Sequence, residues 1–219
     1  MTEDEARLWL ERAVPRETIV KLEELVAIVL DEMSHQNLIS AASAEHIWTR
    51  HIVDSAQLLT LTLPSAKRWI DLGSGAGFPG MVVAAMRDDL RITLVESRRK
   101  RIDFLLAMAD RLGLTERVQV AGCRLELLPT ATFDVISARA FAPIERLLPL
   151  AHRFSHGDTQ WLLPKGKTAL SELEAARASW QGSFRIEQSV TDSEAAIIVA
   201  EQVQPKARQP HVRRAKKNR

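Results

Sequence analysis

A single cysteine, Cys123, is present among 219 residues, so an internal disulfide framework and a cysteine-rich metal site are both excluded. Long hydrophobic runs are also absent, since none approaches the roughly 20 apolar residues that span a bilayer. The N-terminal stretch MTEDEARLWLERAVPRE is charged throughout, unlike a signal peptide. We therefore expect a cytoplasmic protein with no membrane segment and no bound metal.

Acidic residues are missing from the last fifteen positions, 205–219, which hold seven Lys or Arg. The rest of the chain has 23 basic side chains against 28 acidic ones, so a mildly acidic body carries a basic tail. The tail has too few apolar residues to fold alone. It either binds a polyanion or is simply a solvated end of the chain.

The hydrophobic pattern predicts two helices followed by an α/β domain. Apolar residues recur at helical spacing over 17–33, and a second helix is predicted over 43–59 with Ser43 as its N-cap. Beyond these, strands and helices alternate, which indicates a parallel sheet with right-handed crossovers. The last two strands are separated only by TDSE, so we expect them to pair antiparallel. The predicted strands are 68–72, 91–96, 117–122, 133–141, 159–166, 184–190 and 195–203.

This pattern divides the chain into three parts. Residues 1–64 form a helical extension packed on the core, residues 65–204 form the α/β domain, and residues 205–219 form the basic tail. The domain is predicted to be a seven-stranded, mostly parallel sheet that ends in an antiparallel hairpin.

The stretch RWIDLGSGAGFPG, residues 68–80, concentrates glycine at the end of the first predicted strand. Gly73, Gly75 and Gly77 follow the strand and precede a helix. Glycine allows a backbone to adopt positive φ and to approach a ligand closely. In open α/β sheets, ligands bind at the carboxyl ends of the strands. These residues therefore predict a nucleotide site.

Two carboxylates indicate which nucleotide binds there. The third glycine comes one residue earlier than in G-x-G-x-x-G, and Asp71 lies two residues before the first, which suits a cationic ligand better than a pyrophosphate. S-adenosylmethionine is such a ligand, and Glu96, at the end of the second strand, would bind its ribose hydroxyls. Alternatively, Asp71 is a turn acceptor or helix cap and Glu96 a solvated strand end. A nicotinamide-dependent oxidoreductase is the rival enzyme class.

Five motifs in order resemble the RsmG family, also called GidB, of bacterial small-subunit rRNA methyltransferases. The resemblance covers residues 17–203. It implies a Rossmann-like class I S-adenosylmethionine-dependent methyltransferase fold, transfer of a methyl group to N7 of one guanine in the decoding-region loop of 16S rRNA, and a monomer acting on 16S rRNA or the small subunit. The motifs are NLIS (37–40), RHIVDS (50–55), IDLGSGAGFPG (70–80), ISARAFA (136–142) and PKG (164–166).

The resemblance also implies site residues. Arg139 follows the fourth strand and is the candidate catalytic residue, although the family usually reads ISRAF where this chain has an additional Ala138. Alternatively, Arg139 has a structural role and forms an ion pair with a nearby acidic residue. The implied cofactor contacts, together with those expected from the glycine pattern, are Asp71, Gly73, Gly75, Gly77, Phe78, Glu96, Leu125, Glu126 and Arg139.

The sequence indicates the substrate-binding residues less specifically than the cofactor-binding ones. On a regular helix Arg50 could pair with Asp54 at i,i+4 spacing. This helix, with His51, would either border the cleft or have only a structural role, in which the pair stabilises the helix and His51 is an internally bonded histidine. Lys165 would meet phosphate or remain a solvated charge. Guanine N7 carries a free lone pair, so the reaction needs no general base. Methylation of another RNA, or a non-catalytic rRNA-binding role in assembly, are the alternatives.

Overall fold

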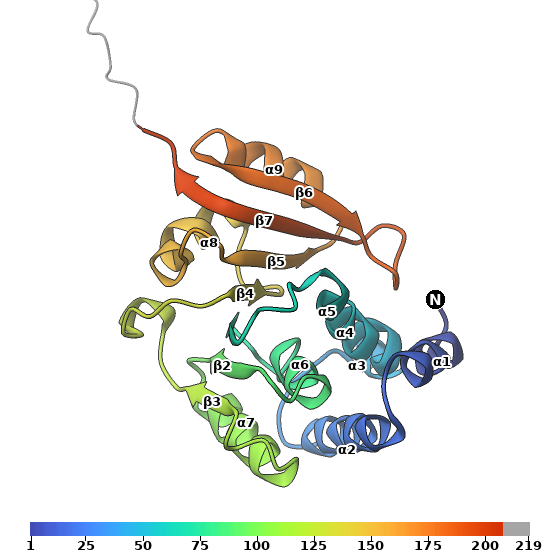
Figure 1. Ribbon diagram of the computed structural model, residues 1–219. Coiled ribbons are helices and arrows are strands. Elements are labelled where there is room, and N and C mark those ends of the chain that lie inside the picture. The colour runs from blue at the N-terminus through green and yellow to red at the C-terminus, as the bar shows by residue number, and fades with distance from the viewer. Residues whose placement is uncertain (208–219) are drawn as a thin grey trace, which may run out of the picture.

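A computed structural model describes residues 1–207 of the chain (Figure 1). Most of the predicted basic tail, residues 208–219, therefore lies outside the described residues. Its first residues still belong to the sheet edge: Pro205 ends the last strand, and the N–H of Lys206 donates to the Ser179 carbonyl at 2.8 Å. Within residues 1–207, no helix combines the length and apolar character that crossing a bilayer requires.

One seven-stranded sheet forms the centre of the molecule, with strand order β3-β2-β1-β4-β5-β7-β6. The neighbours from β3 to β5 pair in parallel, while β7 pairs antiparallel with both β5 and β6. The predicted sheet and its terminal hairpin are thus confirmed. The strands are β1 (Arg68–Leu72), β2 (Arg91–Val95), β3 (Val118–Ala121), β4 (Val135–Ala138), β5 (Gln160–Lys165), β6 (Trp180–Gln188) and β7 (Ala196–Pro205).

Helices cover both faces of the sheet. The larger hydrophobic cluster joins the N-terminal helices, α6 and α7 to one face, and the second cluster joins α8 and α9 to the other. The helices are α1 (Glu3–Ala13), α2 (Arg16–Glu32), α3 (Ala41–Ala44), η1 (Trp48–Val53), α4 (Asp54–Ala56), α5 (Leu58–Leu61), α6 (Gly80–Met86), α7 (Arg99–Arg111), η2 (Leu125–Leu127), α8 (Ile144–Ala151), η3 (His152–Phe154) and α9 (Ala169–Arg177).

The N-terminal helices match the prediction only in part. The predicted helix 17–33 is present as α2, but α1 was not predicted. The predicted helix over 43–59 is helical over most of its length, but it is divided into α3, η1, α4 and α5, and its predicted cap, Ser43, is wrong. Ser40, rather than Ser43, caps a short helix, because its Oγ accepts the Ser43 N–H at 3.1 Å. The following residues form the π-helix η1 before two further short helical segments.

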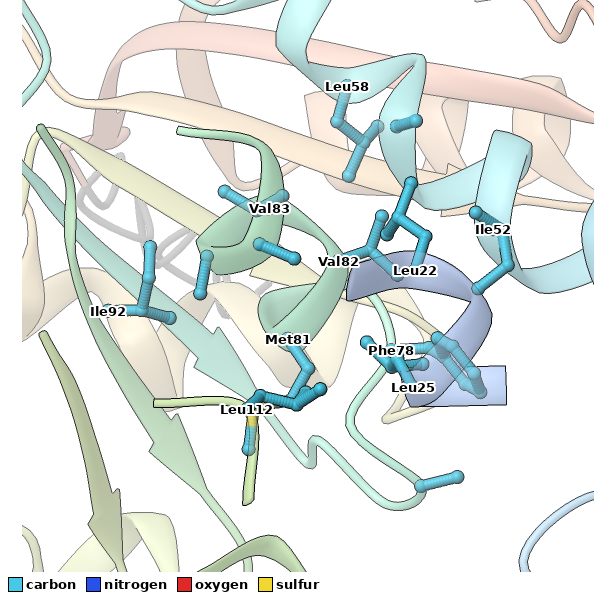
Figure 2. Close-up of a cluster of buried hydrophobic side chains, with 14 of the residues drawn as sticks. Leu22, Leu25, Ile52, Leu58, Phe78, Met81, Val82, Val83, Ile92 and Leu112 are labelled. Carbon is cyan, nitrogen blue, oxygen red and sulfur yellow. The ribbon is translucent and has the colours of Figure 1, made fainter. Parts of the chain in front are cut away.

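Buried leucines fasten the N-terminal helices to the sheet. Figure 2 shows Leu22 and Leu25 of α2 beside Phe78 and Val82, which belong to the segment that follows β1. Leu22 and Leu25 are fully buried, and burying such a side chain contributes roughly 1.5–3 kcal/mol. The N-terminal helices and the α/β domain therefore share one core.

A buried polar chain supports the start of α6. The indole N–H of Trp69 donates to Ser137 Oγ at 2.7 Å, and that hydroxyl donates to Asp71 Oδ1 at 2.7 Å. The other Asp71 oxygen accepts the Gly80 N–H at 3.3 Å. Gly80 has no room for a side chain, because an added Cβ would collide with Leu94 and lie 3.1 Å from Asp71 Oδ2.

Replacing Gly80 with alanine is therefore expected to overpack this junction and lower the free energy of unfolding by roughly 1–3 kcal/mol. Urea unfolding followed by circular dichroism measures the change. Gly157→Ala is the matched control, since an added Cβ there meets nothing within 4 Å. Equal stability of the two variants would contradict the packing described for α6.

Candidate functional site

The glycine loop, residues 73–79, turns the chain from β1 into α6. Its three glycines have positive φ: 70° at Gly73, 58° at Gly75 and 96° at Gly77. The N–H groups of Gly73 and Ser74 both donate to the Val95 carbonyl, at 2.9 and 3.0 Å, which folds the loop over the end of β2. Gly73 and Gly75 are partly exposed, whereas Gly77 is buried. A ligand can therefore reach the backbone at the first two glycines.

Glu96 directly follows β2, is 6% exposed, and lies against this loop. One carboxylate oxygen accepts the Gly75 N–H at 3.1 Å and lies 3.9 Å from the Arg101 guanidinium. The other accepts the N–H groups of Ser97 and Arg98 at 2.7 and 2.9 Å. The carboxylate is thus fixed at the carboxyl end of β2, beside accessible glycine backbone. This combination fits a ligand that carries a ribose.

Asp71 does not face the surface. It is fully buried, and its carboxylate is occupied by Ser137 and Gly80. Burial raises the pKa of Asp71, although its hydrogen bonds act in the opposite direction. The geometry favours the alternative interpretation, in which Asp71 is a turn and helix-cap acceptor that holds the glycine loop, over direct contact with a cationic ligand.

Arg139 is the first residue after β4 and joins the sheet to the N-terminal helices. One terminal nitrogen donates to the Arg50 carbonyl at 3.0 Å and to Asp54 Oδ2 at 3.2 Å. The other approaches His51 Nδ1 at 2.8 Å. The predicted pairing of Arg50 with Asp54 is therefore wrong: Asp54 pairs with Arg139, and the side chain of Arg50 is exposed.

His51 is held between Arg139 and the glycine loop. Its ring stacks on Phe78, with centroids 4.8 Å apart and planes inclined by 21°. Burial lowers the pKa of His51 to about 3, assisted by the positive charges of Arg139 and Arg50. Since Arg139 donates to Nδ1, the proton of the neutral ring lies on Nε2, which has no partner among residues 1–207. His51 is thus a neutral spacer, with no proton to exchange near neutral pH.

The remaining predicted cofactor residues differ in accessibility. Phe78 is 3% exposed and supports the loop from inside, under the His51 ring. Gly77 is needed for packing, because an added Cβ would lie 2.9 Å from Met81 Cγ. In η2, Leu125 is buried and Glu126 is exposed. Only Glu126 of these four presents its side chain to solvent.

Lys165 is neither a solvated charge nor free to meet phosphate. Its ammonium donates to the Ala142 carbonyl at 3.0 Å and lies 2.8 Å from Glu172 Oε2. The same Glu172 oxygen accepts the N–H of Ile144 at 3.0 Å. Although burial raises the pKa of Glu172, hydrogen bonds from Lys165 and its other neighbours hold it below its ordinary value. The pair clamps the β4–α8 loop, residues 139–143.

A cavity of about 900 Å³ opens beside this network. Sequence reasoning did not identify Phe141 or Glu172, which both line it, nor the part of the β6–β7 turn at its rim. The available signal was position alone, since Phe141 lies within the ISARAFA motif. The cavity is lined by residues from η1, the β4–α8 loop, the β5–α9 loop and the β6–β7 turn, including Arg50, Arg139, Phe141, Thr168, Thr191 and Ser193.

Comparison with known proteins identifies similar sequences and folds. The family model described as rRNA small subunit methyltransferase G matches residues 18–200. The Ribosomal RNA small subunit methyltransferase G of Rhizorhabdus wittichii is 67% identical over 95% of this chain and 96% of that protein. The protein of the same name from Zymomonas mobilis is 50% identical over 94% and 96%.

A solved O-methyltransferase from Bacillus cereus, in complex with SAH, shares the fold at a TM-score of 0.56. It is 13% identical to this chain, and the match covers 81% of this chain and 90% of that one. At this level of identity the similarity concerns the fold alone.

The buried neutral state of His51 has a measurable consequence. Between about pH 6.5 and 3 the unfolded chain protonates this residue while the folded chain does not, so stability falls as the pH falls. Relative to His51→Gln, the wild-type free energy of unfolding should decrease by roughly 1.4 kcal/mol per pH unit in this interval. Urea titrations from pH 7 to 4 measure it, with exposed His35→Gln as control. Parallel curves for wild type and His51→Gln would contradict the assignment.

Proposed function

Because this chain belongs to the rRNA small subunit methyltransferase G family, we propose that it methylates N7 of one guanine in the decoding-region loop of 16S rRNA. The observation that carries the proposal is the placement of accessible Gly73 and Gly75 backbone against the fixed Glu96 carboxylate, at the carboxyl ends of adjacent parallel strands. In open α/β sheets this edge is where ligands bind. S-adenosylmethionine is the methyl donor.

Three residues would hold the donor. Gly73 and Gly75 offer partly exposed backbone, which the Phe141 ring borders at Gly73, and Glu96 offers carboxylate oxygens for ribose hydroxyls. Glu126 and the backbone near Leu125 border the adenine side in this proposal. When bound, S-adenosylmethionine supplies a methyl group already activated by its sulfonium charge.

The residues of the site fit a reaction that moves no proton before the transfer. In this reaction the in-plane lone pair of guanine N7 would form the bond to the methyl carbon. The electron pair of the broken carbon–sulfur bond would stay on sulfur. A general base has nothing to remove. Accordingly, the one histidine at the centre of the network, His51, is buried, neutral and bonded to Arg139. The protein contributes by positioning the two reactants, which can be worth roughly 7–11 kcal/mol.

Arg139 is proposed to orient the substrate from the cavity wall. Its guanidinium carries five N–H donors, and the contacts to Arg50, Asp54 and His51 use three of them. The remaining donors suit guanine O6 or a phosphate oxygen. The side chain of Arg50 lines the same cavity and is exposed, so it is the better candidate for a phosphate contact than the paired Lys165.

The enzyme is proposed to act in the cytoplasm, as a monomer, on 16S rRNA or the small ribosomal subunit.

The direct test incubates the purified chain and labelled S-adenosylmethionine with small ribosomal subunits and, separately, with protein-free 16S rRNA. Nucleoside mass spectrometry then identifies the methylated base, and nuclease mapping locates it. We expect one 7-methylguanosine per 16S molecule, in the decoding-region fragment. Methylation of another base or another RNA would contradict the assigned target, and RNA binding without any methylation would indicate an assembly protein.

Glu96→Gln tests the donor site. Charge-assisted hydrogen bonds contribute roughly 1.5–3 kcal/mol, so donor affinity should fall by about tenfold or more. Isothermal calorimetry with S-adenosylmethionine measures the affinity. Glu116→Gln is the control, because Glu116 is exposed and precedes β3, at the amino ends of the strands, whereas Glu96 lies at their carboxyl ends. Unchanged affinity in Glu96→Gln would remove Glu96 from the donor site.

A further inference from the structure

The β4–α8 loop places an exposed aromatic ring between the glycine loop and the cavity. Phe141 is 36% exposed and lines the cavity of about 900 Å³. Its ring also rests on Gly73, since a Cβ added there would lie 2.5 Å from Phe141 Cδ2 and 3.3 Å from Cε2. One ring thus borders both the backbone proposed to hold the methyl donor and the space proposed to receive RNA.

The chain fixes this loop on both sides of the ring. Ala140, directly before Phe141, has φ of 53°, a conformation that L-residues rarely adopt. Directly after it, Lys165 binds the Ala142 carbonyl at 3.0 Å, and Glu172 holds the Ile144 N–H at 3.0 Å. The strained backbone at Ala140 and the two hydrogen bonds after Phe141 together fix the ring at the cavity wall.

Exposure of this ring is unusual within the described chain. Among the large hydrophobic side chains that are exposed in residues 1–207, Phe141 is the only aromatic one. No other phenylalanine and no tryptophan in residues 1–207 lines the cavity, whose remaining wall includes hydroxyl and charged groups such as Thr191, Ser193 and Arg50. An aromatic face surrounded by hydrogen-bonding groups matches a nucleobase, which has an apolar face and a polar edge.

We propose that Phe141 is the platform on which the target guanine stacks, an inference that rests on the proposed function. Stacking engages the faces of the base and leaves its edges free. N7 carries its lone pair in the plane of the base, so a guanine stacked on Phe141 keeps the nucleophile open. The neighbouring glycine loop lies beside the same ring, which brings the reacting edge toward the donor. Arg139, two residues earlier, lines the same cavity and can bind the polar edge.

The test compares Phe141→Leu with Phe141→Tyr. Leucine keeps an apolar side chain but removes the aromatic face, whereas tyrosine retains it. Base–aromatic stacking is strong enough that kcat/KM for the RNA substrate should fall about tenfold or more in Phe141→Leu. In Phe141→Tyr it should stay within about twofold of wild type. Donor affinity, measured by calorimetry, should be unchanged in both. Leu106→Ala, an exposed apolar position on α7 away from the cavity, is the control.

Three outcomes would overturn the platform while wild type still forms 7-methylguanosine. One is full activity of Phe141→Leu. Another is equal loss in Phe141→Leu and Phe141→Tyr, which would mean that shape rather than the aromatic face matters. The third is weakened donor binding with an unchanged KM for RNA, which would make the ring a cover for the donor. If wild type forms no 7-methylguanosine, the proposed function itself fails and the platform fails with it.

Discussion

The guanidinium of Arg139 connects the parts of the molecule that build the site. It leaves the end of β4, binds Asp54 and the Arg50 carbonyl of the N-terminal helices, and contacts His51, which stacks on Phe78 of the glycine loop. The side chains of Arg139 and Asp54 are 19% and 16% exposed, so each charge is largely removed from water. Removing one partner of such a pair strongly destabilises the folded protein, because the other charge is left buried and unpaired.

This arrangement makes the N-terminal helices part of the site and gives the carboxylates separate tasks. The Glu3 carboxylate of α1 accepts the N–H groups of Trp48 and Thr49 at 3.0 and 2.8 Å, and so fixes the start of η1. Asp71 supports the glycine loop from inside, and Glu172 holds the β4–α8 loop. Glu96 lies nearest the accessible glycine backbone. Most charged groups here hold the backbone that would meet the reactants, and few face the reactants themselves.

The sequence was sufficient to predict those elements whose structure is decided by a local pattern of residues. Residues 68–72 are β1 as predicted, because a short apolar run bounded by glycine specifies a buried strand. It was insufficient for η1, since a helical repeat of apolar residues does not reveal a π-helix. The partners of Arg139 and Lys165 also depended on contacts between residues far apart in the chain. For Asp71 the sequence left two roles open, and only its pairing beside Ser137 across β1 and β4 decided between them.

The largely buried pairing of Arg139 with Asp54 joins the N-terminal helices to the end of β4. A double-mutant cycle with Arg139→Ala, Asp54→Ala and the double variant measures that pairing through the free energy of unfolding. We expect a coupling energy of at least about 1 kcal/mol, with the double variant more stable than the sum of the single losses implies. Additive losses, within about 0.3–0.5 kcal/mol, would contradict it.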